Sequence, residues 1–139
     1  MPTATLDLAC DRSAAYHARR WVMQQHLRWA FAGRGGLEHL FYDIVLCISE
    51  LVTTAVEANS SDISLSLQSD AGRIRLSMVD QSDDAPAVRR IRREDTGRRV
   101  RIIDAVATRW GVQSDPDSHE IWIEFALDRG TPTTGVTMA

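Results

Sequence analysis

The sequence predicts an α+β domain in which one sheet, mixed but mostly antiparallel, is covered on one face by three helices, as a two-layer α/β sandwich. Two observations support this fold class. Three segments, 13–32, 37–59 and 98–109, repeat apolar residues at helical spacing, and five short runs have the composition or alternation of strands. The order strand, helix, helix, strand, strand, irregular segment, helix, strand, strand is typical of helices packed on one side of a sheet.

The first half of the chain contains one predicted strand and two predicted helices. Residues 5–10 alternate between apolar and polar side chains, which indicates the first strand. The helix predicted over 13–32 is amphipathic and ends at the glycine-rich run 33–36. The helix predicted over 37–59 has the longest apolar stripe, close to an i, i+3, i+4, i+7 pattern: Leu40, Phe41, Ile44, Val45, Ile48, Leu51, Val52, Ala55 and Val56.

The second half of the chain begins with a predicted hairpin. Its strands contain 63–67 and 74–78, and the turn is Ser69-Asp70-Ala71-Gly72. Residues 81–96 show no periodicity and predict a long exposed loop, a feature that is usually functional or disordered inside a compact domain.

The remaining elements complete the predicted domain. The helix over 98–109 is followed by a short strand at 110–112 and a last strand at 121–127. We therefore expect a single domain over 1–128 and a flexible, Gly/Thr/Pro-rich tail over 129–139.

Composition excludes several classes of function. The 139 residues, 44% apolar and 25% charged, suit one globular domain, and the net charge of −3 does not favour nucleic acid or a membrane surface. No signal peptide or apolar run of membrane-spanning length is recognisable, so a cytoplasmic protein is expected. Cys10 and Cys47 form no metal-binding pattern and are expected to be buried, reduced thiols. All 16 basic residues are arginine, which excludes any mechanism that needs a lysine.

A polar stripe interrupts the apolar pattern of the second helix. At about 100° per residue, Glu50, Thr54 and Glu57 lie on one side of that helix and Thr53 flanks them. Spacing alone favours a solvent-facing stripe. The alternative is a working site, because a carboxylate beside apolar residues can serve as a general base when desolvation raises its pKa.

Further polar signals follow along the chain, each with a structural alternative. Asp80 ends a hydrophobic strand, where an aspartate is usually a cap or turn residue but can also accept a hydrogen bond from the amine of a base. Gly97 opens the third predicted helix, whose free N–H groups could bind phosphate. The arginines between them could form a mobile, solvated surface, contact phosphates or meet an acidic partner.

Together, these stretches resemble the GHKL ATPase superfamily, which has the Bergerat fold. Within it the chain is most similar to the small anti-sigma-factor serine kinases of the RsbW and SpoIIAB type, in their actinobacterial form. The resemblance spans about residues 5–127, and five stretches in the expected order support it: Ser49-Glu50-Leu51-Val52-Thr53, Val79-Asp80, Gly97-Arg98 with Ile102-Ile103-Asp104-Ala105, Arg109-Trp110-Gly111-Val112 and Ile121-Trp122.

The resemblance implies roles for individual residues. Glu50 matches the proposed general base, which activates a serine of an anti-anti-sigma partner toward the γ-phosphate of ATP, and Asp80 matches the residue that reads adenine. Thr54 falls on the position of the family's Mg²⁺-binding asparagine. The full set of implied nucleotide-binding positions is Thr53, Thr54, Asp80, Ser82, Gly97, Arg98 and Arg99. The implied cofactors are ATP and Mg²⁺, and the implied partners are a sigma factor, a STAS-domain anti-anti-sigma factor or both.

The chain also departs from the family pattern at these positions. Thr54 replaces the asparagine, Arg99 replaces the second glycine of a GxG pair, and Glu57 adds a carboxylate where the superfamily often has a cation. The first glycine box, 80–84, contains no glycine, and Ser118-His119-Glu120 stands in place of Gly-Lys-Thr. These departures weaken phosphoryl transfer, which depends on positioning and on charge neutralisation.

Two functions therefore remain open from the sequence. The first is a partner-switching regulator of the anti-sigma type that binds ATP-Mg and phosphorylates a serine of its STAS partner; the intact Glu50 and Asp80 favour it. The second is a protein-interaction module of the same fold, with weak or no nucleotide binding and no kinase activity. Thr54, Glu57 and Arg99 favour this second function. The sequence does not fix the oligomeric state, and the resemblance allows a homodimer.

Overall fold

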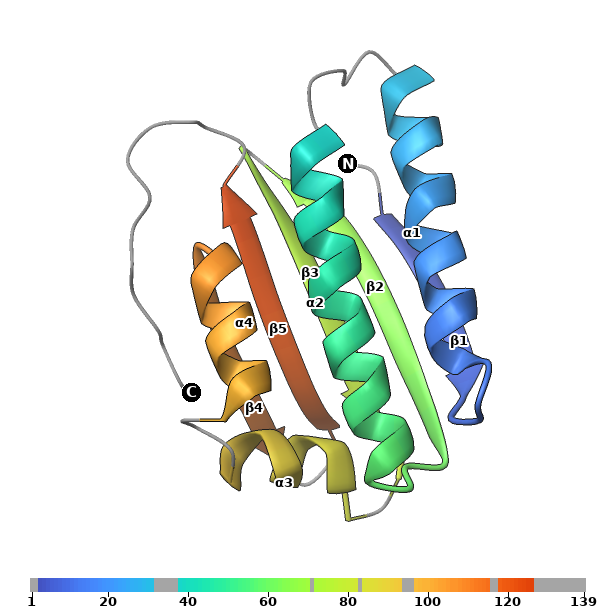
Figure 1. Ribbon diagram of the computed structural model, residues 1–139, viewed down its shortest axis with the longest axis vertical. Coiled ribbons are helices and arrows are strands. Elements are labelled where there is room, and N and C mark those ends of the chain that lie inside the picture. Colours follow the sequence, from blue (N-terminus) through green and yellow to red (C-terminus); the bar gives the residue numbers. More distant parts are fainter. Residues whose placement is uncertain are drawn as a thin grey trace.

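The computed structural model describes residues 3–31, 38–70, 72–82, 84–93, 97–115 and 118–126. Five antiparallel strands form one open sheet in the order β1-β2-β3-β5-β4. The strands are β1 (Thr3–Ala9), β2 (Asp62–Asp70), β3 (Arg73–Asp80), β4 (Arg109–Asp115) and β5 (Ser118–Ala126). Four helices lie on one side of this sheet (Figure 1): α1 (Ala14–Phe31), α2 (Glu38–Glu57), α3 (Pro86–Arg93) and α4 (Arg98–Val106).

The hydrophobic core lies between the sheet and the helices. Side chains alternate along each strand, so every second residue points toward the helices. In β2 these are Ile63, Leu65 and Leu67, all fully buried, whereas the residues between them are partly exposed. The same alternation buries Ile74, Leu76 and Met78 in β3 and Ile121, Ile123 and Phe125 in β5.

α1 and α2 run in opposite directions, side by side over β1, β2 and β3 (Figure 1). Their contact is partly aromatic. The Phe41 ring of α2 stacks on His26 with ring centroids 4.8 Å apart and meets the edge of Trp29 at 5.4 Å. These contacts fix the level at which the two helices face each other.

The apolar character of α2 bears on the membrane expectation. By length and composition the window His39–Glu57 could cross a membrane, contrary to the expectation from the sequence. Half of that window is buried inside the fold, a property that it shares with the core helices of soluble proteins.

The predicted α+β class is confirmed, with two corrections. The described strand pairs are all antiparallel, so the sheet is not mixed. There are four helices instead of three, because part of the predicted loop 81–96 forms α3. Pro86 takes the first helical position, where its missing N–H costs nothing, and Ala87, Val88 and Ile91 are buried on one side of the helix. This short apolar pattern was hidden among the arginines of the segment.

Several predicted boundaries also shift. The third predicted helix ends at Val106 instead of 109, because Arg109 already pairs with Glu124 as the first residue of β4. The predicted strand 110–112 extends to 109–115 for the same reason. The glycine-rich run 33–36 and the tail 129–139 lie outside the described residues.

Candidate functional site

Asp80 ends β3 on the helix side of the sheet and is only 3% exposed. Its carboxylate accepts three hydrogen bonds: from the Ser60 hydroxyl at 2.9 Å, the Ser82 backbone N–H at 3.0 Å and the Ala87 backbone N–H at 2.9 Å. The predicted adenine-reading carboxylate is therefore buried and bound by groups of its own chain.

The local fold explains why Ser60 reaches Asp80. α2 ends in a Schellman motif, in which the Ser60 N–H donates to the Ala55 carbonyl and the Asn59 N–H donates to the Val56 carbonyl. Asn59 takes the left-handed conformation that this motif requires, with φ of 63°. The chain leaving the helix is thereby directed toward the end of β3.

The first turn of α3 takes a hydrogen-bond acceptor from β3, since the Ala87 N–H donates to Asp80. Ala85 precedes the helix, and its carbonyl accepts the first helical bond, from the Arg89 N–H. An alanine side chain cannot accept a hydrogen bond from the free N–H groups of the first turn. Asp80 of β3 serves as that acceptor, and its negative charge lies at the positive end of the helix dipole. The position of α3 and the occupation of Asp80 are therefore linked.

Thr54 does not share the exposed stripe with Glu50 and Glu57, as the spacing had suggested. It is fully buried, because its position is rotated about 40° from Glu50 toward the core side of the helix. Its hydroxyl donates to the Glu50 backbone carbonyl at 2.7 Å. The predicted Mg²⁺ ligand is thus turned onto its own helix backbone. Among the described residues, no group of three His, Cys, Asp or Glu side chains could hold a metal ion.

Glu50 and Glu57 do share the outer side of α2, where they form ion pairs with arginines of α3 and α4. The Arg99 guanidinium lies 3.6 Å from Glu50 and also donates a hydrogen bond to Glu57. Arg90 of α3 lies 3.5 Å from Glu57. The site is partly exposed, since 22% of the Glu50 side chain and 20% of the Arg99 side chain are accessible. We call Glu50, Glu57, Arg90 and Arg99 the arginine clasp, because it ties three helices together across their outer surface.

The remaining predicted site residues lie around the clasp and around Asp80. Gly97 precedes α4 in extended conformation, with no side chain capping the helix. Gly97, Arg98, Arg99 and Glu50 line an open hollow of about 360 Å³. Ser82 lies away from this hollow, and its hydroxyl accepts a hydrogen bond from the Ser61 N–H at 2.7 Å.

The structure therefore divides the predicted site in two. Glu50, Gly97, Arg98 and Arg99 come together around the hollow. Asp80 and Ser82 form a separate, internally hydrogen-bonded group at the end of β3. Thr53, between the two carboxylates of α2, is half-buried. Sequence reasoning missed Ser60 and Arg90, whose roles depend on the end of α2 and on α3.

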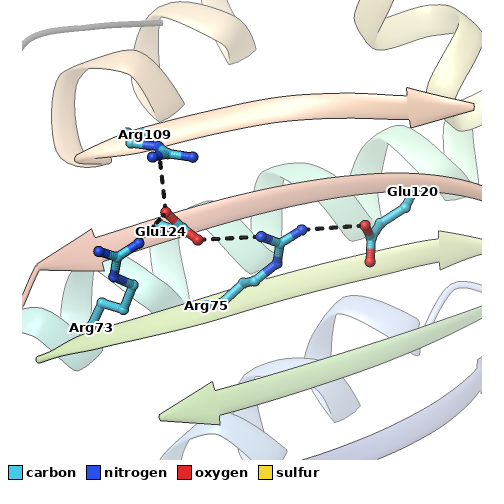
Figure 2. Close-up of polar contacts among 5 residues, drawn as sticks. All are labelled: Arg73, Arg75, Arg109, Glu120 and Glu124. Carbon is cyan, nitrogen blue, oxygen red and sulfur yellow. Dashed lines mark hydrogen bonds and ion pairs between the residues drawn. The ribbon is translucent and has the colours of Figure 1, made fainter. Parts of the chain in front are cut away.

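A second polar cluster on the open face of the sheet was also missed (Figure 2). Glu124 accepts contacts from Arg73 at 3.5 Å, Arg75 at 3.2 Å and Arg109 at 3.5 Å. Arg75 also reaches Glu120 at 3.5 Å. Both Arg75 and Arg109 lie over the Trp122 ring, so this tryptophan is only 5% exposed on a face that no helix covers. In the sequence, this cluster is indicated by the alternation of Glu120, Trp122 and Glu124 in β5. The alternation can be interpreted once the strand pairing shows that Arg75 and Arg109 are the neighbours of Glu124.

Burial and nearby carboxylates also affect the two thiols. The pKa of the Cys47 thiol rises to about 12, first because of burial and then because Asp43 and Glu50 are near. The pKa of Cys10 rises to about 11, chiefly by burial and then by the charge of Asp80. Both cysteines are free, and Cys47 is buried as expected, but the expectation of burial is wrong for Cys10, which is half-buried. The raised pKa values of both thiols argue against reactive thiolates.

Comparisons with known proteins add no identification. No protein-family model matches this chain, and a search of curated proteins found no match.

Proposed function

We propose that this protein is a partner-switching regulator of the anti-sigma type that acts as a protein-interaction module, binding a sigma factor or a STAS-domain antagonist without nucleotide and without kinase activity. The observation that carries this proposal is the state of Asp80. Its carboxylate is 3% exposed and accepts three hydrogen bonds from its own chain, so a base could reach it only if these groups moved. A protein that acts only by binding another protein does not need the Asp80 carboxylate to be available for a nucleotide.

Two further contacts support the absence of nucleotide chemistry. The Thr54 hydroxyl is buried against the Glu50 carbonyl, so the residues present do not fit a bound Mg²⁺. The Glu50 carboxylate lies 3.6 Å from the Arg99 guanidinium, and a general base that is held in an ion pair is less free to reach the proton that it removes. The resemblance to anti-sigma-factor kinases then supports the kind of partner, while these contacts argue against phosphoryl transfer.

The ATP-dependent serine kinase remains a second candidate because of one observation. Glu50, Gly97, Arg98 and Arg99 line a single open hollow, whose volume of about 360 Å³ is at the lower end of ligand sites. For this function α3 would have to leave Asp80, and Arg99 would have to leave the two carboxylates of α2.

Titration with Mg·ATP separates the two candidates. A nucleotide at about 100 times its dissociation constant stabilises a fold by about 2.7 kcal/mol, which is readily seen as a rise in melting temperature. For the interaction module we expect no shift and no calorimetric heat at millimolar Mg·ATP. A clear shift, together with phosphate transfer to a purified STAS-domain protein of the same organism, would overturn the proposal in favour of the kinase.

The interaction itself needs a separate measurement. Purified sigma factors and STAS-domain proteins of the same organism are titrated against the chain by calorimetry, with and without Mg·ATP. We expect one of them to bind with the same affinity in both conditions. Affinity that depends on nucleotide would contradict the nucleotide-independent module, and absence of binding by every member of both classes would contradict the anti-sigma type of function.

A further inference from the structure

Three arginines gather at one end of the sheet face that lies opposite the described helices: Arg73 and Arg75 of β3 and Arg109 of β4 (Figure 2). The strand register explains why they meet, because Arg75 and Arg109 are the two neighbours of Glu124 across β5. Arg73 lies two residues before Arg75, so both point to the same side of β3. We call Arg73, Arg75 and Arg109 the arginine end of the open face.

The guanidinium groups form the outer layer of this cluster, and the carboxylate lies beneath them. Only 9% of the Glu124 side chain is accessible, compared with 54% of Arg73 and 51% of Arg109. Arg73 contacts Glu124 through one Nη atom and Arg109 through its Nε atom. A guanidinium carries five N–H donors, and half of each side chain is exposed, so donors of both arginines face solvent. A ligand that approaches this end of the sheet therefore meets cations first.

A hollow of about 390 Å³ lies beside the arginine end, and its lining carries both signs of charge: Gln68, Asp70, Arg73, Arg75 and Glu124. Asp70 ends β2, and Glu120 lies further along β5, where it contacts Arg75. These two carboxylates border the arginine end on two sides and repel an anion there. The path that remains for an anionic ligand runs across β3, β5 and β4.

We propose that the arginine end binds an extended, acidic segment of another protein, which crosses β3, β5 and β4 and places its carboxylates against Arg73 and Arg109. A guanidinium binds a carboxylate through two parallel hydrogen bonds, which makes arginine the residue suited to such a ligand. This surface lies on the side of the sheet away from Glu50 and Asp80, so the inference does not rest on the proposed function.

The spacing of the two arginines suits an extended chain. Neighbouring strands are about 4.8 Å apart and a strand rises about 3.3 Å per residue, so the Cα atoms of Arg73 and Arg109 are about 12 Å apart. Carboxylates two to four residues apart on an extended segment are separated by about 7–13 Å. One segment can therefore contact both arginines at once without folding into a helix.

Positive charge alone would also attract nucleic acid, but two other features favour a peptide. Single-stranded nucleic acid is held largely by bases that stack on accessible aromatic rings. Trp122 is only 5% exposed, because Arg75 and Arg109 lie over its ring. Asp7 and Asp62 lie at the opposite end of the sheet and would repel a phosphate backbone that continued along it, whereas a short acidic run in a protein need not extend so far.

The position of Glu124 gives the proposal a distinctive consequence. Its carboxylate already contacts the guanidinium groups that a ligand carboxylate would use, so the two compete. Removing the charge of Glu124 should therefore strengthen binding of an acidic segment. If the arginines served only to hold the sheet together, the same change would give no gain in binding.

Fluorescence anisotropy of a labelled peptide tests the proposal with the full chain. The probe alternates glutamate and threonine over about ten residues, which favours an extended chain with its carboxylates on one side. The same peptide with glutamine in place of glutamate is the control ligand. We expect the acidic peptide to bind and the neutral one not to bind. The affinity should fall as the salt concentration rises from about 0.1 to 0.5 M.

Four variants locate the binding surface. Arg73→Gln and Arg109→Gln should each weaken binding about fivefold, as expected for the loss of one partly exposed ion pair. Glu124→Gln should tighten it about threefold or more. Arg101→Gln, the same loss of charge at an exposed position of α4, is the matched control and should bind like the unmodified chain. Circular dichroism of each variant establishes that it is folded before its affinity is interpreted.

Several outcomes would overturn the proposal. One is the absence of binding by both the unmodified chain and Glu124→Gln. Another is an equal loss in Arg101→Gln, which would mean that net charge attracts the peptide. Weaker binding by Glu124→Gln would place the peptide away from the arginine end. If an oligothymidine of the same charge binds more tightly than the peptide and loses affinity in Arg73→Gln and Arg109→Gln, the surface takes nucleic acid and the proposal fails.

Discussion

The Oδ2 atom of Asp80 accepts a hydrogen bond from the Ala87 backbone N–H at 2.9 Å, and this contact joins the end of β3 to the first turn of α3. Asp80, for which the sequence favoured a cap or turn and the resemblance implied base recognition, therefore caps a helix of its own chain. Because the same oxygen also accepts from Ser60, the ends of α2, β3 and α3 meet at one carboxylate. The stability of this corner should depend strongly on Asp80.

Removing the carboxylate measures that dependence. Asp80→Ala leaves three donors without an acceptor, two of them in buried hydrogen bonds, so we expect the free energy of unfolding to fall by about 2–4 kcal/mol in urea denaturation. The control is Asp70→Ala, since Asp70 ends β2 and is exposed; its change should stay within about 0.5 kcal/mol. An Asp80→Ala protein as stable as the original would show that the carboxylate does not hold this corner together.

Thr54 offers a second test, because the two functions give opposite expectations for Thr54→Asn. In the structure this position is fully buried, so the larger amide lacks room and partners, and we expect a loss of about 1–3 kcal/mol with no response to Mg·ATP. Thr54→Val keeps the shape and removes only the bond to the Glu50 carbonyl, and should cost less than about 1.5 kcal/mol. A Thr54→Asn protein that gains Mg·ATP-dependent stabilisation would mean that the position faces a nucleotide site.

These positions show how far the candidate site could be predicted from the sequence. The spacing correctly placed Glu50 and Glu57 on one side of α2, where Arg99 contacts both carboxylates. It misplaced Thr54, because a rotation of about 40° separates an exposed position from a buried one and the helical period alone does not locate that boundary. The three donors to Asp80 could not be predicted, since they come from the end of α2 and from a helix that looked like a loop.

The open face of the sheet gives a third prediction. Glu124→Gln removes the charge that three arginines share, so we expect a loss of about 1–2 kcal/mol, smaller in 1 M salt than in 0.1 M salt. Glu120→Gln is the matched control, because among the residues drawn in Figure 2 Glu120 contacts Arg75 alone and is more exposed than Glu124; its cost should be about 0.5 kcal/mol or less. Equal costs for the two variants, or a cost independent of salt, would contradict the central role of Glu124.

The same face shows which part of the fold the sequence could predict. The alternation in β2, β3 and β5 fixed which residues enter the core, since burial on one side of a sheet leaves a period of two. The polar cluster around Glu124, in contrast, depends on which strands are neighbours in the sheet. Arg75 of β3 and Arg109 of β4 both pair with Glu124 of β5, from opposite sides of that strand. The two arginines are far apart in the sequence, so no local sequence pattern predicts that they meet.

The last prediction concerns Cys47 and alkaline pH. The folded state keeps this thiol neutral, with a pKa of about 12, whereas the unfolded chain ionises it near its ordinary pKa of 9.0. The contribution of the neutral thiol is therefore complete below pH 9 and is lost as the pH rises toward 12, by at most about 1.4 kcal/mol per pH unit. We expect the stability difference between the unmodified chain and Cys47→Ala to shift by that slope above pH 9, because all other titrating groups cancel in the comparison.

Thiol labelling checks the same claim independently of stability. At pH 8 an aromatic disulfide reagent should modify Cys47 only at the rate of global unfolding, since the side chain is fully buried and the thiolate is the reactive form. Cys10, half-buried with a pKa of about 11, should react sooner but still more slowly than a free thiol. Labelling of Cys47 in the Cys10→Ala protein at the rate of a small-molecule thiol would mean that α2 opens toward solvent at this position, and then neither the burial of Cys47 nor the pH slope derived from it would hold.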